Sequence, residues 1–572
     1  MKVERRDWGA IALLVLGVWA IYGQTGDFGC LSYDDEGYTV NCPFVTGGLT
    51  FENVGMAFKD LAWGGIWMPL TNITYMATIS LFGKGFGAQH LVSVLFHSIN
   101  AALFFLLLVR LSKGRATLSF IFAALWALHP LRVESVAWIA SRKDTVFTMF
   151  TLLGLLAWQA RRWGWGTAAM AAACLSKPTA MCFPFLAFAV EFFNEDGGGG
   201  RARSRALGTL ALRYAPLFVL AAATGGLAMY SQTHATGEAT HELFYSTFGW
   251  RILNAAVSLG LYLYHLVVPV GLHFWYRPIR GGIPLDAATG LVTLAVTTVL
   301  FAFAVWRCRK ARRHILLAAL WFLAAIGPTL GVAGSFGNHA LADRFTYVPM
   351  MAFSILAVLA FPRIGRKWAY AVLVIVASVY GVVSFRYAAT YRNNLTAFSK
   401  VAADDPGHAY AWTNIGSELI LKEGDPNVGI PYFRKSLALF PTDEARDELA
   451  FALIARKNPA DFEEIERLCA DVIADPTKDE KGFKLEALGM IAIARRDWAR
   501  AIACLERAVK QSGENVREDC LMRLAMCHWN IKQYAAAAPY LMRLSASQRP
   551  DISAKAKELL SMMPPAMGPA AK

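Results

Sequence analysis

Charged residues are scarce in this chain. Of its 572 residues, 17% are Asp, Glu, Lys or Arg and 56% are hydrophobic, and the mean hydropathy is +0.38. A soluble protein of this length needs more polar surface, so the composition predicts a polytopic membrane protein. Apolar runs separated by short basic loops continue to about residue 390, and the sequence then becomes polar. We therefore expect a membrane domain over 1–390 and a soluble domain over 400–560.

Three common kinds of enzyme motif are also missing. The sequence has no glycine-rich phosphate loop and no nucleophile elbow, and its nine cysteines show no metal-ligand spacing. A soluble nucleotide donor therefore has no evident site, whereas a lipid-borne donor needs none. The net charge of +14 does not indicate nucleic acid, because many basic residues lie in the short loops that orient membrane spans.

The basic loops predict the topology. "MKVERRD" precedes the first apolar run, so the N-terminus is expected in the cytoplasm and the loop 24–87 outside. The segment 251–270 carries Arg251 and His265 and is predicted to be interfacial or re-entrant. Eleven crossings then place the C-terminal domain outside. They are 9–23, 88–109, 117–131, 145–160, 166–176, 178–193, 214–230, 286–305, 314–333, 346–361 and 368–385.

An acidic stretch follows the first predicted span. "YDDE" contains Asp34, Asp35 and Glu36, all expected at the external membrane face. A carboxylate there suits a general base that takes a proton from an acceptor hydroxyl. Two adjacent carboxylates could instead hold a divalent cation, and a plain solvated loop is the structural alternative.

Further polar clusters fall on the same predicted side of the membrane, where loops of a helical bundle can form one site. Arg142, Lys143 and Arg344 are candidates to bind the phosphate of a lipid-linked donor, because guanidinium and ammonium groups bind phosphate oxygens. Anchoring to lipid headgroups, or pairing of Asp343 with Arg344, is the structural alternative. The accessory candidates are Glu36, His90, His129, Arg132, Glu134, Asp144, Lys177 and Asp343.

The polar tail contains a repeat. Gly416, Ala452, Gly489 and Ala525 are spaced 36 or 37 residues apart, each within a helical pattern. Small residues at this period allow close packing of paired helices and predict tetratricopeptide repeats. Their groove usually binds extended peptide, so we expect the tail to recognise an acceptor polypeptide. A spacer or a dimerisation domain is the alternative.

Several stretches together resemble one family. They are "YDDEGYTVNCP", "WMPLTNITY", "GAQHLVSVLFHSINAALF", "ALHPLRVESVAWIASRKD", "LSKPTAMCFPFLAF" and "ALADRFTYVP", followed by the repeats. In this order they are similar to bacterial membrane proteins with a GT-C glycosyltransferase core and a repeat tail. These are related to the eukaryotic transmembrane and tetratricopeptide-repeat O-mannosyltransferases.

The resemblance implies an all-α GT-C fold in a bacterial inner membrane. It also implies a polyprenyl-phosphate donor of a hexose such as mannose, with inverting transfer to Ser or Thr hydroxyls of protein outside. The catalytic acidic residue of such enzymes, which acts as a general base, lies in the first external loop and corresponds to Asp34 or Asp35. "DE" followed by Tyr38 favours Asp35. Two alternatives stay open: transfer of a lipid-linked sugar to a glycolipid or polysaccharide, and a non-catalytic scaffold that uses the repeats.

Overall fold

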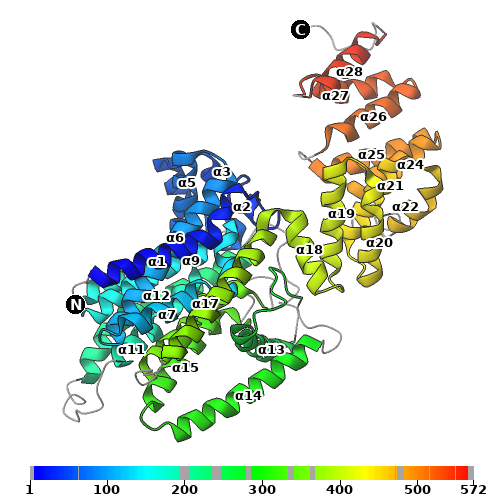
Figure 1. The fold of residues 1–572 in the computed structure, drawn as a ribbon. Helices are drawn as coiled ribbons and strands as arrows, with labels where there is room; N and C mark the ends of the chain where they lie inside the picture. Colours follow the sequence, from blue (N-terminus) through cyan, green and yellow to red (C-terminus); the bar gives the residue numbers. More distant parts are fainter. Residues whose placement is uncertain are drawn as a thin grey trace. The chain divides into compact units, whose positions relative to one another are not determined.

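The computed structural model describes residues 5–61, 63–193, 206–234, 247–277, 285–332, 341–360, 367–470, 472, 479, 482–513, 516–547 and 549–564. Within these ranges every regular element is an α- or 3-10 helix, which confirms the predicted all-α fold (Figure 1). The chain forms two compact units, Met1–Asp404 and Asp405–Lys572.

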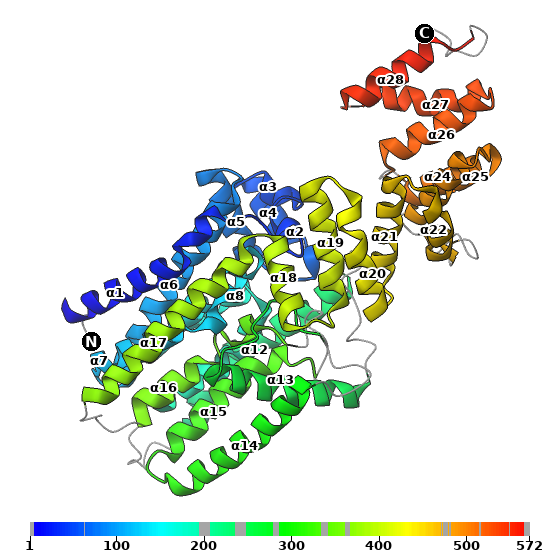
Figure 2. The same cartoon turned by 45° about the vertical axis from the view of Figure 1, so that its right-hand side comes forward.

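The N-terminal unit is a bundle around α6 (Phe86–Leu111). This helix packs against α1 (Arg5–Tyr22) and α7 (Ala116–Ala127) (Figure 2) and against α9 (Arg142–Gln159) (Figure 1). The other helices are α2 (Asp35–Tyr38), α3 (Pro43–Thr46), α4 (Phe51–Lys59), α5 (Pro69–Phe82), α8 (Val133–Ala137), α10 (Trp163–Cys174), α11 (Phe183–Phe193), α12 (Ala206–Thr233), α13 (Phe248–Val267), α14 (Leu285–Arg307), α15 (Arg312–Ile326), α16 (Met351–Ala360), α17 (Lys367–Ala388) and α18 (Asn394–Asp404).

Several of these helices can cross a membrane. By length and composition five described segments qualify, and a pair bent by 60° brings the number to six. Exposed apolar side chains such as Val299 and Trp306 on α14 suit contact with lipid. The predicted count of eleven spans stays a prediction, and the last residues of the predicted spans 314–333 and 346–361 lie outside the described part. The five segments that can cross a membrane are Arg5–Asp27, Phe86–Leu111, Ala211–Ser231, Ala287–Arg307 and Trp368–Arg392. The bent pair is Ala116–Ala127 with Pro130–Ala137.

The bent pair lies in the segment that carries several of the predicted site residues. The helix α7 ends before Pro130, whose ring cannot continue it, and the His129 Nδ1 atom caps the following turn by accepting from the Leu131 N–H at 3.1 Å. The chain then runs through α8 and a 3-10 turn, Ile139–Ser141, into α9. All residues from 129 to 148 are buried, so the charged side chains of this stretch need partners inside the protein.

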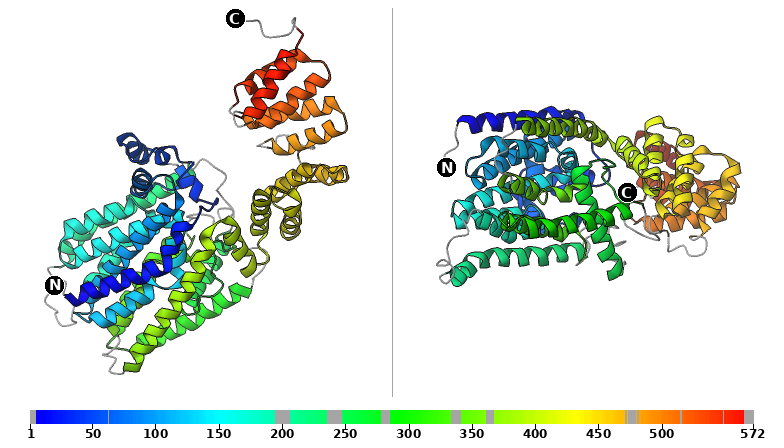
Figure 3. Two further views of the ribbon diagram at one scale, coloured as in Figure 1. Left: turned by 45° about the horizontal axis from the view of Figure 1, so that its top comes forward. Right: turned by 60° about the horizontal axis from the view of Figure 1, so that its bottom comes forward.

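The C-terminal unit consists of packed consecutive helices, and α26, α27 and α28 lie side by side (Figure 3). A Cβ atom added to Gly416 would lie 2.7 Å from the Phe433 ring, and one added to Gly489 would lie 2.8 Å from Leu505. Glycine is therefore required where paired helices approach closely. The helices are α19 (Ala409–Glu423), α20 (Ile430–Leu439), α21 (Asp443–Arg456), α22 (Phe462–Leu468), α24 (Phe483–Ala494), α25 (Trp498–Ser512), α26 (Glu518–Asn530), α27 (Tyr534–Ser545) and α28 (Pro550–Ser561).

Candidate active site

Asp35 is buried and holds two segments of the site together. Its Oδ2 atom accepts from the Leu31 N–H at 2.9 Å, and its Oδ1 atom accepts from the Ala140 N–H at 2.7 Å. The side chain thereby joins the acidic stretch to the turn that precedes α9. Both carboxylate oxygens of Asp35 thus accept backbone N–H groups, and the residue is 0% exposed.

Asp34 lies in a different environment from its neighbour. It is half-buried, and the N–H of Tyr38 bonds to its carbonyl oxygen rather than to its carboxylate. Burial raises the pKa of the Asp34 carboxyl, and the positive charges of Lys143 and Arg344 act against that rise. A reachable carboxylate with a raised pKa is suited to accept a proton. Glu36 is also half-buried, on α2.

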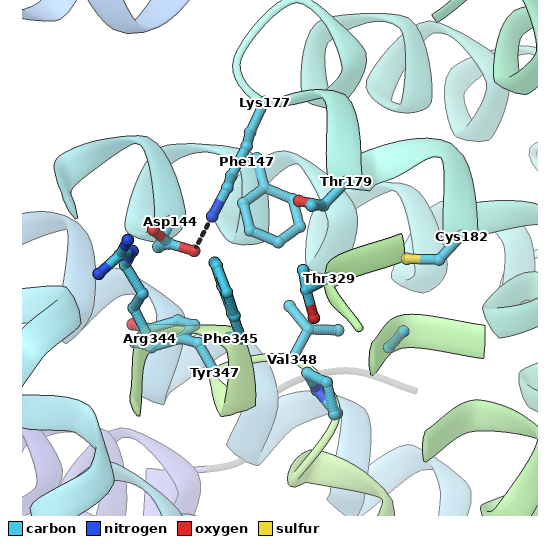
Figure 4. A pocket seen from close by; sticks show the side chains of 12 residues that line it. Asp144, Phe147, Lys177, Thr179, Cys182, Thr329, Arg344, Phe345, Tyr347 and Val348 are labelled. Carbon is cyan, nitrogen blue, oxygen red and sulfur yellow. Dashed lines mark hydrogen bonds and ion pairs between the residues drawn. The ribbon is translucent and has the colours of Figure 1, made fainter. Parts of the chain in front are cut away.

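Six charged side chains form a compact network, which we call the charged cluster. Arg344 forms an ion pair with Glu134, whose other oxygen accepts from the Arg344 backbone N–H at 2.7 Å. The Lys177 Nζ atom donates to Asp144 at 2.5 Å, as Figure 4 shows. The cluster comprises Asp34, Glu134, Lys143, Asp144, Lys177 and Arg344.

Lys143 reaches the cluster from the start of α9. Its Nζ atom lies 4.4 Å from the centroid of the Tyr38 ring and 3.4 Å from the Tyr38 hydroxyl. Burial lowers the pKa of the Lys143 ammonium group, and the negative charges of Asp34 and Asp144 act against that fall. Four positions predicted from separate loops, those of Asp34, Lys143, Lys177 and Arg344, are therefore brought together.

Arg142 does not take part in this cluster. Its Nε atom donates to Ser93 and its Nη1 atom to Thr78, both at 3.2 Å, while its Nη2 atom donates to the carbonyl and the side chain of Gln89. These four bonds occupy most of the five N–H donors of a guanidinium. Its carbon Cζ also lies 4.4 Å from the Tyr75 ring centroid. Arg142 therefore ties α9 to α6 and α5 rather than facing an open site.

Asp343 also has local partners. It accepts from the hydroxyls of Tyr276 at 2.9 Å and Tyr387 at 3.2 Å. Burial and the nearby Glu134 charge raise the pKa of Asp343. Asp343 therefore bonds to tyrosines, and its neighbour Arg344 pairs with Glu134. The two residues do not pair with each other as the structural alternative expected.

The remaining accessory candidates hold loops in place. Arg132 donates to the Thr346 carbonyl at 3.1 Å and to its hydroxyl at 2.6 Å. The Nε2 atom of His129 lies 3.0 Å from the Leu266 carbonyl. The Nε2 atom of His90 lies 2.8 Å from the Gly29 carbonyl, which fixes the start of the acidic loop.

A narrow pocket opens beside the ion pair of Lys177 and Asp144 (Figure 4). Its volume of about 10 Å³ holds about one water molecule, less than a phosphate group needs. Arg344, Phe147 and Phe345 contribute to its lining. The Oδ2 atom of Asp144 is buried and has no hydrogen-bond partner in the described part of the chain.

The predicted cation site fits this arrangement poorly. Both Asp35 oxygens accept N–H groups, which leaves Asp34 as the available carboxylate of the pair. Within the described ranges no three His, Cys, Asp or Glu side chains are grouped to hold a metal ion.

Sequence reasoning missed an aromatic cluster next to Asp34. Tyr33, Phe274 and Trp275 come from two segments far apart in the chain and lie with ring centroids 4.6 to 6.4 Å apart. The sequence signal was the run "HFWY" at 273–276, directly after a predicted interfacial segment.

The environment of Asp35 predicts a pH effect on stability. Burial raises its pKa from the ordinary 3.8 to about 7, although the two backbone N–H bonds act in the opposite direction. The folded state then holds this proton more tightly than the unfolded state, so the contribution of Asp35 to stability falls as pH rises from about 4 to about 7. We expect the difference in melting temperature between wild type and Asp35→Asn to change over that window. A constant difference from pH 4 to pH 8 would contradict this assignment.

Comparison with known proteins gives one long and two short similarities. The chain is 22% identical over 448 residues to "Protein O-mannosyl-transferase F38B6.6" of Caenorhabditis elegans, covering 73% of this chain and 61% of that protein. It is 32% identical over 109 residues to "Protein O-mannosyl-transferase TMTC2" of Mus musculus and 30% identical over 106 residues to the Homo sapiens protein of that name. These two matches each cover 17% of this chain and 13% of the relative. No protein-family model matches the chain.

The chain thus spans less than two thirds of the length of each of these relatives. The similarity supports a relationship to the O-mannosyl-transferases with these names.

Proposed function

We propose that the N-terminal unit is a GT-C membrane glycosyltransferase. It moves a hexose such as mannose from a polyprenyl phosphate to Ser or Thr hydroxyls of a polypeptide at the external face. The observation that carries the proposal is the half-buried Asp34 carboxylate within a cluster of three cations, Lys143, Lys177 and Arg344. A base beside cations is what displacement of a sugar from a lipid phosphate requires. The names of the relatives support the reaction class.

The proposed step uses Asp34 as the base. Its carboxylate takes the proton of the acceptor hydroxyl, whose oxygen forms a bond to the anomeric carbon from the face opposite the phosphate. The bond between the anomeric carbon and the phosphate oxygen breaks, and the polyprenyl phosphate leaves with the electron pair. The configuration at the anomeric carbon inverts. Asp35 keeps Asp34 in position through the two backbone N–H bonds.

The phosphate is assigned to Lys143, Lys177 and Arg344 rather than to Arg142. The guanidinium of Arg142 is occupied by Gln89, Ser93 and Thr78. Lys177, by contrast, has Asp144 as its counterion, and a donor phosphate could take the place of that carboxylate.

The C-terminal unit completes the proposal as a tetratricopeptide-repeat domain that binds the acceptor polypeptide. Paired helices with required glycines at Gly416 and Gly489 support the repeat assignment. The proposed setting is a bacterial inner membrane, with the repeats outside.

A panel of donors tests the reaction class. The purified full chain would be incubated in detergent with membrane-protein extract and with radiolabelled polyprenyl-phosphate hexoses or nucleotide hexoses. We expect label to move from one lipid-linked hexose and from none of the nucleotide sugars, with Lys177→Met lowering the rate about 100-fold because a phosphate ligand is lost. Transfer from a nucleotide sugar, or from no donor with the protein folded, would contradict the proposal.

A further inference from the structure

An aromatic wall stands next to the proposed base. It consists of Tyr33, Trp138, Phe274, Trp275 and Phe398, which come from four separate segments of the N-terminal unit. The Tyr33 ring centroid lies 4.6 Å from that of Trp275, 6.1 Å from Phe274 and 6.2 Å from Trp138. Phe398 packs on Phe274 at 5.3 Å. Tyr33 and Trp275 are half-exposed, whereas the other three are buried.

The wall is continuous with the charged cluster at two points. Tyr33 directly precedes Asp34 in the chain. The Arg344 guanidinium carbon lies 5.0 Å from the centroid of the Trp138 ring. Tyr33 is therefore the chain neighbour of the proposed base, and the buried Trp138 ring contacts Arg344, a proposed phosphate ligand.

The indole of Trp138 has an unused donor. The residue is 1% exposed, and its Nε1–H group has no hydrogen-bond acceptor among the residues that the structure describes. A buried N–H group without an acceptor is unfavourable because it has lost its hydrogen bonds to water, so such groups usually meet a ligand or water. An indole can only donate, which makes a hydroxyl or carboxylate oxygen the matching partner.

We infer that the aromatic wall is the subsite for the transferred hexose, with the sugar ring on Tyr33 and Trp275 and a sugar hydroxyl accepting from Trp138. A hexose has a C–H face that packs on aromatic rings and hydroxyls that need partners at its rim. A lipid chain would pack on the rings, but it has no oxygen to accept a hydrogen bond from the Trp138 indole. The inference rests on the proposed function, because the sugar must reach both Asp34 and the phosphate ligands.

The loop that carries Tyr33 is fixed for such a role. The Gly29 N–H donates to the Arg392 carbonyl at 2.9 Å, and the Ser32 N–H donates to Asn394 Oδ1 at 2.8 Å. Together with Asp35 these bonds hold both sides of Tyr33. A preorganised ring loses little freedom when the sugar binds.

Equilibrium binding of two short-chain lipids tests the inference. Farnesyl-phosphate hexoses and sugar-free farnesyl phosphate would be titrated into the purified full chain in detergent, with wild type, Tyr33→Ala, Trp275→Ala and Trp138→Phe. Trp165→Ala is the matched control, since Trp165 is 71% exposed on α10. We expect the three wall variants to weaken binding of the preferred hexose lipid about tenfold and to leave farnesyl phosphate within twofold. Tyr33→Phe keeps the ring and should behave like wild type.

The outcomes separate the subsite from the proposed function. If wild type binds none of the hexose lipids, the proposed function fails and the subsite with it. If wild type discriminates and the wall variants discriminate equally well, only the subsite is overturned. An equal loss for both lipids would show that the wall binds the lipid phosphate or supports the fold.

Discussion

Replacing Asp34 by Asn is expected to slow sugar transfer about 10²- to 10⁴-fold, the usual contribution of a general base. The Asp34 side chain is half-buried, and no backbone N–H is bonded to its carboxylate in the described structure. The melting temperature of the Asp34→Asn variant should therefore stay near that of wild type. Binding of the anionic donor should be unchanged or tighter, because a negative charge beside Lys143 and Arg344 is removed. Single-turnover rates and thermal unfolding of the same preparation measure both effects.

Two neighbours supply matched controls for this prediction. Asp35→Asn should lower the free energy of unfolding by about 1–3 kcal/mol, because an amide nitrogen cannot accept one of the two backbone N–H bonds. Glu36→Gln should change little in either measurement. Asp34→Asn with near-wild-type rates, combined with a well-folded but inactive Asp35→Asn, would transfer the base role to Asp35.

Loss of Arg344 is expected to have the largest effect on stability. Glu134 is 0% exposed, and Arg344→Met would leave its carboxylate buried without a counter-charge, at a cost of about 3–5 kcal/mol. Transfer should also be lost, since Arg344 is a proposed phosphate ligand. Thermal and chemical unfolding in detergent measure the first effect.

A second substitution separates the two roles of Arg344. In the double variant Arg344→Met with Glu134→Gln, the buried charge is gone, and the glutamine oxygen can still accept from the backbone N–H of residue 344. Most of the lost stability should return, while transfer stays absent. Recovery of transfer together with stability would show that Arg344 only supports the fold.

The sequence was informative about segments and much less so about individual roles. Apolar runs and basic loops indicated an all-α membrane unit, because burial in lipid imposes long hydrophobic segments on the sequence itself. The topology predicted from these runs and loops placed Asp34, Lys143, Lys177 and Arg344 on one expected face of the membrane. The structure brings their side chains together.

What the sequence could not specify is which polar partners each side chain finds. Arg142 and Lys143 are adjacent and chemically alike, yet Arg142 binds Gln89, Ser93 and Thr78 whereas Lys143 lies against Tyr38. The preference for Asp35 over Asp34 followed the "DE" pattern of the resemblance. Hydrogen bonds to Leu31 and Ala140 depend on a loop conformation that local sequence does not determine, and they favour Asp34 as the base.

The most direct test of the central claim is mass spectrometry of the acceptor. Wild type and Asp34→Asn would be incubated with the preferred polyprenyl-phosphate hexose and a Ser- and Thr-containing polypeptide taken from the active membrane-protein extract. The account predicts a hexose on Ser or Thr of the polypeptide with wild type and unmodified polypeptide with Asp34→Asn. A hexose found on lipid or polysaccharide instead, or equal modification by both proteins, would contradict it.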